Sequence, residues 1–264
     1  MPLQLNPPFR HQLAQADRTL FGGWICSGSP VAAEIMAGAG LDWLLIDMEH
    51  APNGLESVLA QLHAVSGYPS TPVVRVPIGD TVVIKQVLDL GAQNILVPMV
   101  STAEQARDIA AMAQYPPAGR RGVGSALARS ARWNRVPGYL PDGADHVSVF
   151  VQVETPEGVE NAEAIAAVEG IDGIFVGPSD LAASMGLIGQ QTHPDVVAAV
   201  KRAFAAAAAA NKPAGVNAFD PQAARDYAVS GASWILVGAD VALLARGSEK
   251  LAADFIPTAT GTGA

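Results

Sequence analysis

Short runs of apolar residues, rich in Val, Ile and Leu, recur at regular intervals along the chain. Most of these runs are continuous and do not alternate with polar residues, which is typical of parallel strands that are covered on both faces. The pattern predicts eight strands, at Gly22–Gly28, Trp43–Met48, Pro72–Pro77, Asn94–Val100, Val147–Glu154, Gly173–Pro178, Pro213–Ala218 and Ser233–Ala239.

Helical segments separate these runs. Asp80 is a capping candidate for one of them, and Thr155 precedes a proline at the first helical position of another. Strands and helices that alternate eight times over about 250 residues predict a (β/α)8 TIM barrel, an α/β fold. The alternative is a doubly wound open sheet, but the segment SGSPVA after the first strand lacks its phosphate-binding glycine pattern. The predicted helices are Val31–Gly40, Gly54–Val65, Asp80–Leu90, Thr102–Ala113, Pro156–Val168, Pro194–Ala210, Pro221–Ser230 and Val241–Asp254.

The spacing indicates one barrel domain over residues 1–256, followed by a disordered tail at 257–264. One long interruption, near 114–147, carries five arginines. A loop of this length inside a compact barrel is usually a lid or an interface, and the alternative is a solvated insertion.

Composition narrows the classes of function. Half of the 264 residues are hydrophobic and only 16% are charged, which excludes a disordered chain. The net charge of −9 argues against non-specific binding to nucleic acid or to an anionic membrane. The single cysteine, Cys26, allows no intrachain disulfide and is expected to be a core thiol. With no apolar run long enough to span a bilayer and no signal peptide evident, we expect a globular cytoplasmic protein.

Two carboxylates follow consecutive predicted strands, at the end where barrel enzymes carry their active sites. Neighbouring strands lie about 4.8 Å apart, so Glu154 and Asp180 can reach one point. A divalent cation such as Mg²⁺ or Mn²⁺ would relieve their mutual repulsion. The alternative is that each caps a helix or pairs with an arginine.

Three further polar residues lie at the same predicted edge. Arg75, inside an apolar strand, requires an anion, which is either a ligand at the barrel mouth or a structural partner. His50 follows Asp47 by three residues, so the two could form a dyad, the alternative being a loop histidine satisfied locally. None of the four lysines ends a strand, which disfavours a Schiff-base aldolase.

The segments GAGLDWLLIDMEHAPN, KQVLDLGAQNILVPMV, YPPAGRRGVGSALARSARWN, VQVET and DGIFVGPSDLAASMG resemble the HpcH/HpaI family of class II pyruvate aldolases. The resemblance runs from about Phe21 to Phe255 and implies a TIM barrel of the phosphoenolpyruvate/pyruvate-binding type. It also implies reversible, metal-dependent cleavage of 4-hydroxy-2-oxo acids to pyruvate, or a substituted 2-oxo acid, plus an aldehyde. The reaction would pass through a metal-stabilised enolate with Mg²⁺, Mn²⁺ or Co²⁺.

The resemblance also implies roles for individual residues. Glu154 and Asp180 match the metal ligands, Arg75 matches an arginine at the keto oxygen, and His50 with Asp47 matches the acid or base. Asn217 departs from the aliphatic residue frequent in relatives, which leaves the aldehyde preference open. The implied substrate-binding residues are Trp24, Asp89 (in a neighbouring subunit's site), Gln152, Gly177, Pro178, Ser179 and Asn217.

Small-molecule substrates and a homohexamer of two trimers, with the last helix exchanged between barrels, complete what the resemblance implies. Three alternatives stay open at this point: a CoA-thioester lyase of the malyl- or citryl-CoA type, an enzyme acting on phosphonates, and a non-catalytic barrel that binds keto acids.

Overall fold

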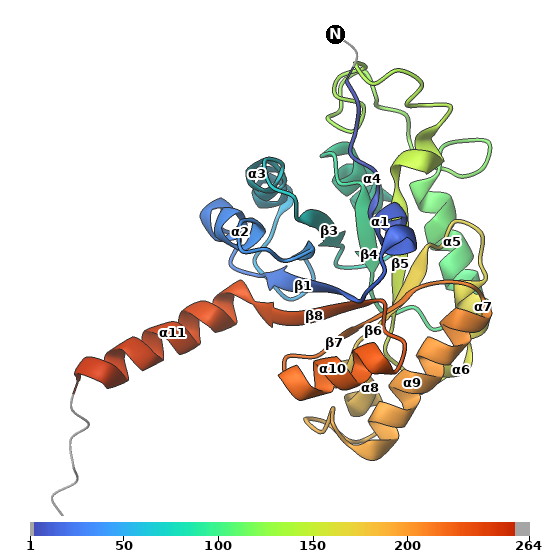
Figure 1. Cartoon of the computed structure of the whole chain (residues 1–264). Coiled ribbons are helices and arrows are strands. Elements are labelled where there is room, and N and C mark those ends of the chain that lie inside the picture. The colour runs from blue at the N-terminus through green and yellow to red at the C-terminus, as the bar shows by residue number, and fades with distance from the viewer. Residues whose placement is uncertain (1–2, 257–264) are drawn as a thin grey trace, which may run out of the picture.

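The strands form a closed barrel in which each pairs in parallel with its sequence neighbours and β8 pairs with β1 (Figure 1). This computed structural model describes residues 3–256, and the tail expected at 257–264 lies outside that range. The predicted TIM barrel is therefore confirmed. The strands are β1 (Leu20–Ile25), β2 (Trp43–Asp47), β3 (Thr71–Arg75), β4 (Asn94–Val97), β5 (Ser148–Val153), β6 (Gly173–Val176), β7 (Ala214–Asn217) and β8 (Trp234–Ala239).

Most of the helices follow strands and cover the outside of the barrel, whereas α1 precedes β1 and α11 extends away from the barrel (Figure 1). The single helix expected over Pro156–Val168 is instead two short helices, and α1 and α8 are additional to the expected set. The helices are α1 (Phe9–Gln15), α2 (Pro30–Ala37), α3 (Leu55–Val65), α4 (Thr81–Asp89), α5 (Ala103–Ala113), α6 (Pro156–Glu160), α7 (Ala162–Ala166), α8 (Pro178–Ser184), α9 (Pro194–Ala209), α10 (Pro221–Val229) and α11 (Asp240–Phe255).

Local sequence sets where several helices begin. The Asp80 carboxylate accepts the backbone N–H groups of Val82 and Val83, which confirms it as the N-cap of α4. Thr155 caps α6 through the N–H of Gly158, ahead of the proline at the first helical position. Because these caps hold the turns that follow the strands, they fix the backbone around the barrel mouth.

Aromatic rings fill the base of the barrel, at the N-terminal ends of the strands. The indoles of Trp43 and Trp234 lie with ring centroids 5.1 Å apart, and the α1 side chain Phe9 packs on both. Gly22 and Gly215 make room for them, because an added Cβ at either glycine would overlap an indole. Leucines and phenylalanines lie between this base and the mouth, including buried Leu45, Phe150, Phe175 and Leu236.

The Arg-rich stretch 114–147 is a run of turns that ends in a short 3-10 helix, Gly143–His146. It is anchored by ion pairs from Arg120 to Asp108 and from buried Arg121 to Asp89. Three buried residues of the stretch, Ala131, Val136 and Tyr139, form a small apolar cluster of their own.

The last helix, α11, projects away from the barrel (Figure 1). Its exposed apolar side chains include Leu243, Leu244, Leu251 and Phe255, which are 60–79% accessible. Across residues 3–256, no helix is long and apolar enough to cross a membrane.

Candidate active site at the mouth of the barrel

Four polar or aromatic side chains form the layer of the barrel interior nearest the mouth. Trp24, Arg75, Gln152 and Asn217 come from β1, β3, β5 and β7, and alternate strands supply such layers in TIM barrels. Their strand neighbours Val74, Val151, Val153 and Val216 belong to the apolar core between strands and helices. Because side chains alternate along a strand, the four therefore point inward.

Arg75 is the most constrained group of this layer. Arg75 is 5% exposed, and its guanidinium donates from Nε and Nη2 to the two carboxylate oxygens of Asp47, each at 2.8 Å. Nη1 lies 2.8 Å from a carboxylate oxygen of Glu49, and the Trp24 ring centroid lies 4.4 Å from the guanidinium carbon. The arginine is thus held in one orientation by charge-assisted bonds and a cation–π contact.

Trp24 is itself oriented by Asn217. The indole Nε1–H donates to the Asn217 side-chain oxygen at 2.8 Å. Asn217 ends β7, whereas Trp24 lies on β1, so the bond crosses the mouth above β8. An aliphatic residue at position 217 could not accept this bond, and the indole nitrogen would lose its partner.

Glu154 lies just beyond β5 and is 2% exposed. Its two oxygens accept from Gln152 Nε2 at 2.5 Å and from the Met99 backbone N–H at 2.7 Å. Burial raises the pKa of Glu154 to about 7, the two hydrogen bonds oppose that rise, and the charges of Asp180 and Glu49 add to it. A cation bound here would offset the electrostatic repulsion of Glu154 by Asp180 and Glu49.

Asp180 lies in the first turn of α8, which follows the Gly177–Pro178 turn at the end of β6. A Cβ at Gly177 would lie 2.8 Å from Glu154 Oε2 and 3.1 Å from Gln152 Nε2, so only glycine lets this turn approach the carboxylate. Asp180 and Ser179 are exposed to the mouth, while Pro178 is buried. The structure therefore brings the two predicted metal ligands to adjacent strand ends.

The expected dyad of Asp47 with the His50 ring is not formed. Asp47 instead accepts from Arg75 and from the backbone N–H of His50, the latter at 3.3 Å. The His50 side chain is 66% exposed at the mouth, with Nε2 3.9 Å from Glu49. The dyad is absent because Arg75, on the neighbouring strand, donates two buried hydrogen bonds to Asp47. A single N–H of the His50 ring cannot compete with this paired interaction.

Two residues of this site were not predicted from sequence. Glu49 holds Arg75, and its pKa is raised by burial despite the opposing charges of Arg75 and His50. Met99 supplies a backbone donor to Glu154 from a positive φ of 60°, a conformation rare for a residue other than glycine. Glu49 could have been found from its place in the polar run after β2, but no residue pattern marks Met99.

One remaining sequence candidate, Asp89, lies outside this cluster, and Cys26, which was expected to be a core thiol, is partly buried. Asp89 ends α4 at the base of the barrel and accepts from Arg121 Nη2 at 3.0 Å, so it is absent from the site of its own chain. Its expected reach into a neighbouring subunit's site stays a prediction. Burial raises the pKa of Cys26 to about 12, assisted by Asp47 and Asp240, so this thiol is a poor nucleophile.

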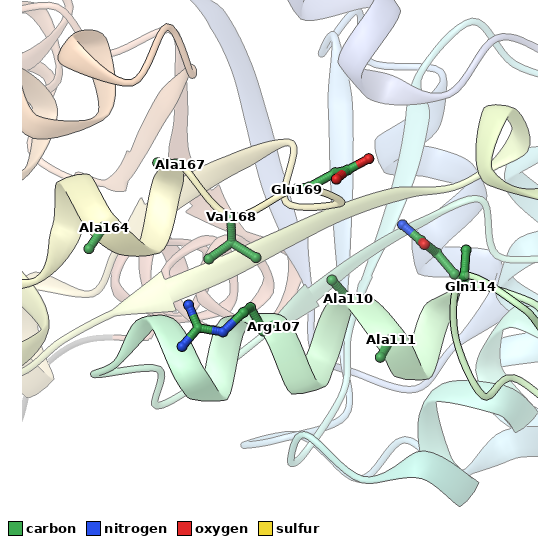
Figure 2. A pocket seen from close by; sticks show the side chains of 9 residues that line it. Arg107, Ala110, Ala111, Gln114, Ala164, Ala167, Val168 and Glu169 are labelled. Carbon is green, nitrogen blue, oxygen red and sulfur yellow. The ribbon is translucent and has the colours of Figure 1, made fainter.

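The outer surface carries a separate groove of about 620 Å³ between α5 and α7. Figure 2 shows that the short side chains of Ala110, Ala111, Ala164 and Ala167 line much of it. None of the residues at the barrel mouth lines this groove, so it lies apart from the candidate active site.

The sequence profile of the family described as HpcH/HpaI aldolase/citrate lyase matches residues 20–246. The chain belongs to the HpcH/HpaI aldolase/citrate lyase family. The sequence-based assignment is therefore confirmed over most of the chain.

Individual HpcH/HpaI relatives cover nearly the whole chain. A hydroxypyruvate/pyruvate aldolase of Deinococcus radiodurans is 52% identical, over 96% of this chain and 92% of that protein. A 4-hydroxy-2-oxo-heptane-1,7-dioate aldolase of Salmonella arizonae is also 52% identical, over 91% and 92% of the two chains. The crystal structure of a family protein from Burkholderia cenocepacia superposes with a TM-score of 0.89 at 41% identity, covering 93% and 98%. The chain is thus an aldolase, a carbon–carbon lyase.

Proposed function

We propose that this aldolase cleaves 4-hydroxy-2-oxo acids to pyruvate, or a substituted 2-oxo acid, plus an aldehyde, with a divalent cation held by Glu154 and Asp180. The observation that carries the proposal is the buried Arg75 guanidinium, fixed by Asp47 and Glu49 at the mouth that also holds both acidic residues. The Salmonella aldolase is named for a 4-hydroxy-2-oxo acid, and the Deinococcus aldolase is named for hydroxypyruvate and pyruvate, which are 2-oxo acids.

The residues at the mouth fit a hard divalent cation. Mg²⁺ and Mn²⁺ are commonly bound by one or two carboxylates, with substrate and water as the other ligands. Glu154 and Asp180 supply two carboxylates, and residues 3–256 contain no cluster of three or more His, Cys, Asp or Glu that would form a closed protein cage. Gln152 Oε1 is buried without a hydrogen-bond partner within the described chain, which leaves an acceptor for a metal-bound water or a substrate hydroxyl.

A cation bound there would act as a Lewis acid on the keto oxygen of the 2-oxo acid. Arg75 supplies the second positive charge at that oxygen, where negative charge accumulates as the C3–C4 bond breaks. Since Asp47, Glu49 and Trp24 already fix the guanidinium, little reorganisation is needed during the reaction.

The proton steps fall to His50 in this proposal. In cleavage, a base removes the C4 hydroxyl proton, the C3–C4 bond electrons pass to the 2-oxo acid as an enolate, and the aldehyde leaves. The enolate is then protonated at C3. His50, exposed at the mouth, can take up the hydroxyl proton and exchange it with solvent. Asp47 positions it through the backbone N–H.

At the turn Gly177, Pro178 and Ser179, the substrate carboxylate would be held by the backbone N–H groups of Ser179 and Asp180, which lie in the first turn of α8 and have no intrahelical partners. Pro178 has no N–H, and the Gly177 N–H donates to the Val153 carbonyl. A cavity of about 710 Å³ opens beside this turn and is lined in part by Pro178, Ser179, Asn217 and Phe219. We propose that the part of the substrate that leaves as aldehyde lies toward this cavity.

A retro-aldol screen tests the proposed function. The purified enzyme with Mg²⁺, Mn²⁺ or Co²⁺ is given several 4-hydroxy-2-oxo acids, and pyruvate release is followed with lactate dehydrogenase. We expect pyruvate from more than one of them, and release about two to three orders of magnitude slower from the Arg75→Ala variant. Aldol addition with pyruvate and with hydroxypyruvate separates the two possible 2-oxo acids. Cleavage of malyl- or citryl-CoA with no cleavage of free hydroxy-oxo acids would overturn the proposal.

Asn217→Leu is expected to lower kcat/KM about fivefold, because one buried hydrogen bond contributes about 1 kcal/mol. The loss follows from a less well fixed Trp24 ring beneath Arg75. Steady-state kinetics of pyruvate release measure it.

Trp24→Phe is the matched variant, because it removes the indole donor while keeping an aromatic ring. We expect the double variant to lose about as much kcat/KM as the more impaired single variant, since both substitutions break the same hydrogen bond. Fully additive losses would show that Asn217 does not act through Trp24.

We further propose that the enzyme is a cytoplasmic homohexamer of two trimers, in which α11 packs on a neighbouring barrel. The proposal is supported by the apolar side chains that α11 exposes away from its own barrel. A helix with such a face gains stability only when the face is covered.

Leu244→Asp, placed on a side chain that is 70% exposed, is expected to reduce the assembly to smaller species. Sedimentation velocity of the wild type and the variant measures this. Lys250→Gln, at another exposed position of α11, changes the net charge by the same amount and should sediment as wild type does. A monomeric wild type would contradict the assembly.

A further inference from the structure

Two arginines of the stretch 114–147, Arg129 and Arg132, converge at the base of the barrel. A Cβ built at Gly91 would lie 2.5 Å from Nη1 of Arg129 and 3.0 Å from Nη1 of Arg132, so both guanidinium groups rest on the same backbone position. Arg129 donates to the Leu90 carbonyl at 3.1 Å, and Arg132 donates to the Arg129 carbonyl at 2.5 Å. Since a guanidinium has five N–H donors, most of them stay available.

Neither arginine pairs with a carboxylate anywhere in the described residues 3–256. The other arginines of the same stretch are satisfied differently: Arg120 and Arg121 pair with acidic residues, and Arg135 is exposed to water. Arg129 and Arg132 are half-buried, so solvent screens their repulsion less than it would at the surface.

The positive charge in this place is concentrated. Burial, followed by the charge of Arg132, lowers the pKa of Arg129 to about 10. The His63 ring also has a lowered pKa, caused by burial and then by both arginines. The chain as a whole carries a net charge of −9, so composition does not account for two adjacent unpaired cations.

A small cavity of about 150 Å³ opens onto the two guanidinium groups. Other parts of its wall are polar, including Ser66, Thr71 and Gln93, and no Asp or Glu among the described residues lines it. Three successive residues, Arg132, Trp133 and Asn134, have positive φ angles of 50°, 54° and 63°. Conformations of this kind persist only where the surrounding structure imposes them.

We propose that Arg129 and Arg132 form a binding site for a small oxyanion, a phosphate or a carboxylate. Guanidinium groups bind both anions through paired N–H donors, and two of them around one cavity supply a strong site. A bound anion would remove the repulsion between the arginines and fasten the stretch 114–147 to the end of α4.

The proposed anion site is separate from the candidate active site. Its walls include Thr71 and Asn94, the first residues of β3 and β4, whereas Arg75 and Glu154 lie at the opposite ends of their strands. An anion there therefore cannot contact the 2-oxo acid, and its binding does not depend on the proposed reaction.

Thermal unfolding of the full chain in inorganic phosphate, with ionic strength held constant by NaCl, tests the site. We expect a saturable rise in Tm of about 5 °C at a phosphate concentration 100 times Kd. Arg129→Gln and Arg132→Gln should each weaken apparent phosphate affinity at least tenfold, while the exposed Arg135→Gln should behave as wild type does. The same measurement with malonate in place of phosphate distinguishes a carboxylate site from a phosphate site. The anion that binds more tightly identifies the natural class of ligand.

Further variants show which site causes the phosphate-dependent rise in Tm. Arg75→Ala should keep the phosphate-dependent rise in Tm, and loss of the rise in that variant would place the anion in the active site and overturn the proposal. No saturable rise in wild type, or an unchanged rise in both Gln variants, would overturn it as well. If the Gln variants fold poorly, Arg129→Lys replaces them, because lysine keeps the positive charge but lacks the paired N–H donors of a guanidinium. We expect this variant to bind phosphate more weakly than wild type, as measured by calorimetry.

Discussion

Arg75→Ala is expected to lower kcat for aldol cleavage by about two to three orders of magnitude, the usual loss when a fixed electrostatic stabiliser is removed. The reason lies in the geometry: the guanidinium is held by Asp47, Glu49 and Trp24 where charge develops on the keto oxygen. Pyruvate release at saturating substrate measures the loss. Turnover within tenfold of wild type would remove Arg75 from the mechanism.

The same substitution is also expected to destabilise the fold. Asp47 is 1% exposed, and removing its partner leaves a buried charge, which costs about 3–5 kcal/mol. Arg75→Lys separates the two effects, because it keeps the positive charge but cannot make the paired bonds. We expect this variant to unfold within a few degrees of wild type and still lose about 100-fold in kcat. Equal losses of stability in both variants would indicate a mainly structural arginine.

Chelation with EDTA is expected to reduce aldolase activity to below about 1% of its starting value, since the Lewis acid would be lost. Added Mg²⁺, Mn²⁺ or Co²⁺ should restore activity, and circular dichroism should stay unchanged because the barrel core does not depend on the cation. Full activity in EDTA, or borohydride trapping of the substrate on a lysine, would indicate a Schiff-base enzyme instead.

Two substitutions locate the cation in that experiment. Glu154→Gln should abolish reactivation by metal, and Gln152→Leu should weaken metal affinity by about 10–100-fold, because Gln152 orients Glu154. Asp108→Asn is the matched control, since that carboxylate only pairs with Arg120 on the surface. Unchanged metal affinity in Glu154→Gln would place the cation elsewhere.

The barrel could be predicted from sequence because its strands are local signals. Runs such as the one at Trp43–Met48 are apolar on both faces, and caps such as Asp80 mark helix starts within a few residues. The break between α6 (PEGVE) and α7 (AEAIA) at Asn161 was not predicted, since a single asparagine inside a helical run does not by itself end a helix. The α1 helix was missed because seven residues give too little periodicity to recognise.

The candidate active site was predictable as a set of residues but not as a set of bonds. Position at a strand end pointed to Glu154, Asp180 and Arg75, because parallel strands end on one edge. Which partner each residue takes depends on its cross-strand neighbour: Asp47 faces Arg75 in register, a pairing that the spacing from Asp47 to His50 concealed. The role of Met99 depends on one backbone dihedral angle, which no sequence pattern encodes.

The aromatic rings that pack on Phe9 hold the barrel together at its base, while Trp24 and Asn217 lie at the mouth in one layer with Arg75 and Gln152. Tolerance to substitution should therefore increase along the barrel axis, from the base to the mouth. Randomised libraries limited to Ser179, Asn217 and Phe219, which line the cavity beside the mouth, can change which aldehyde is accepted with little loss of soluble yield, whereas changes near Trp43 or Trp234 should appear mainly as misfolded protein.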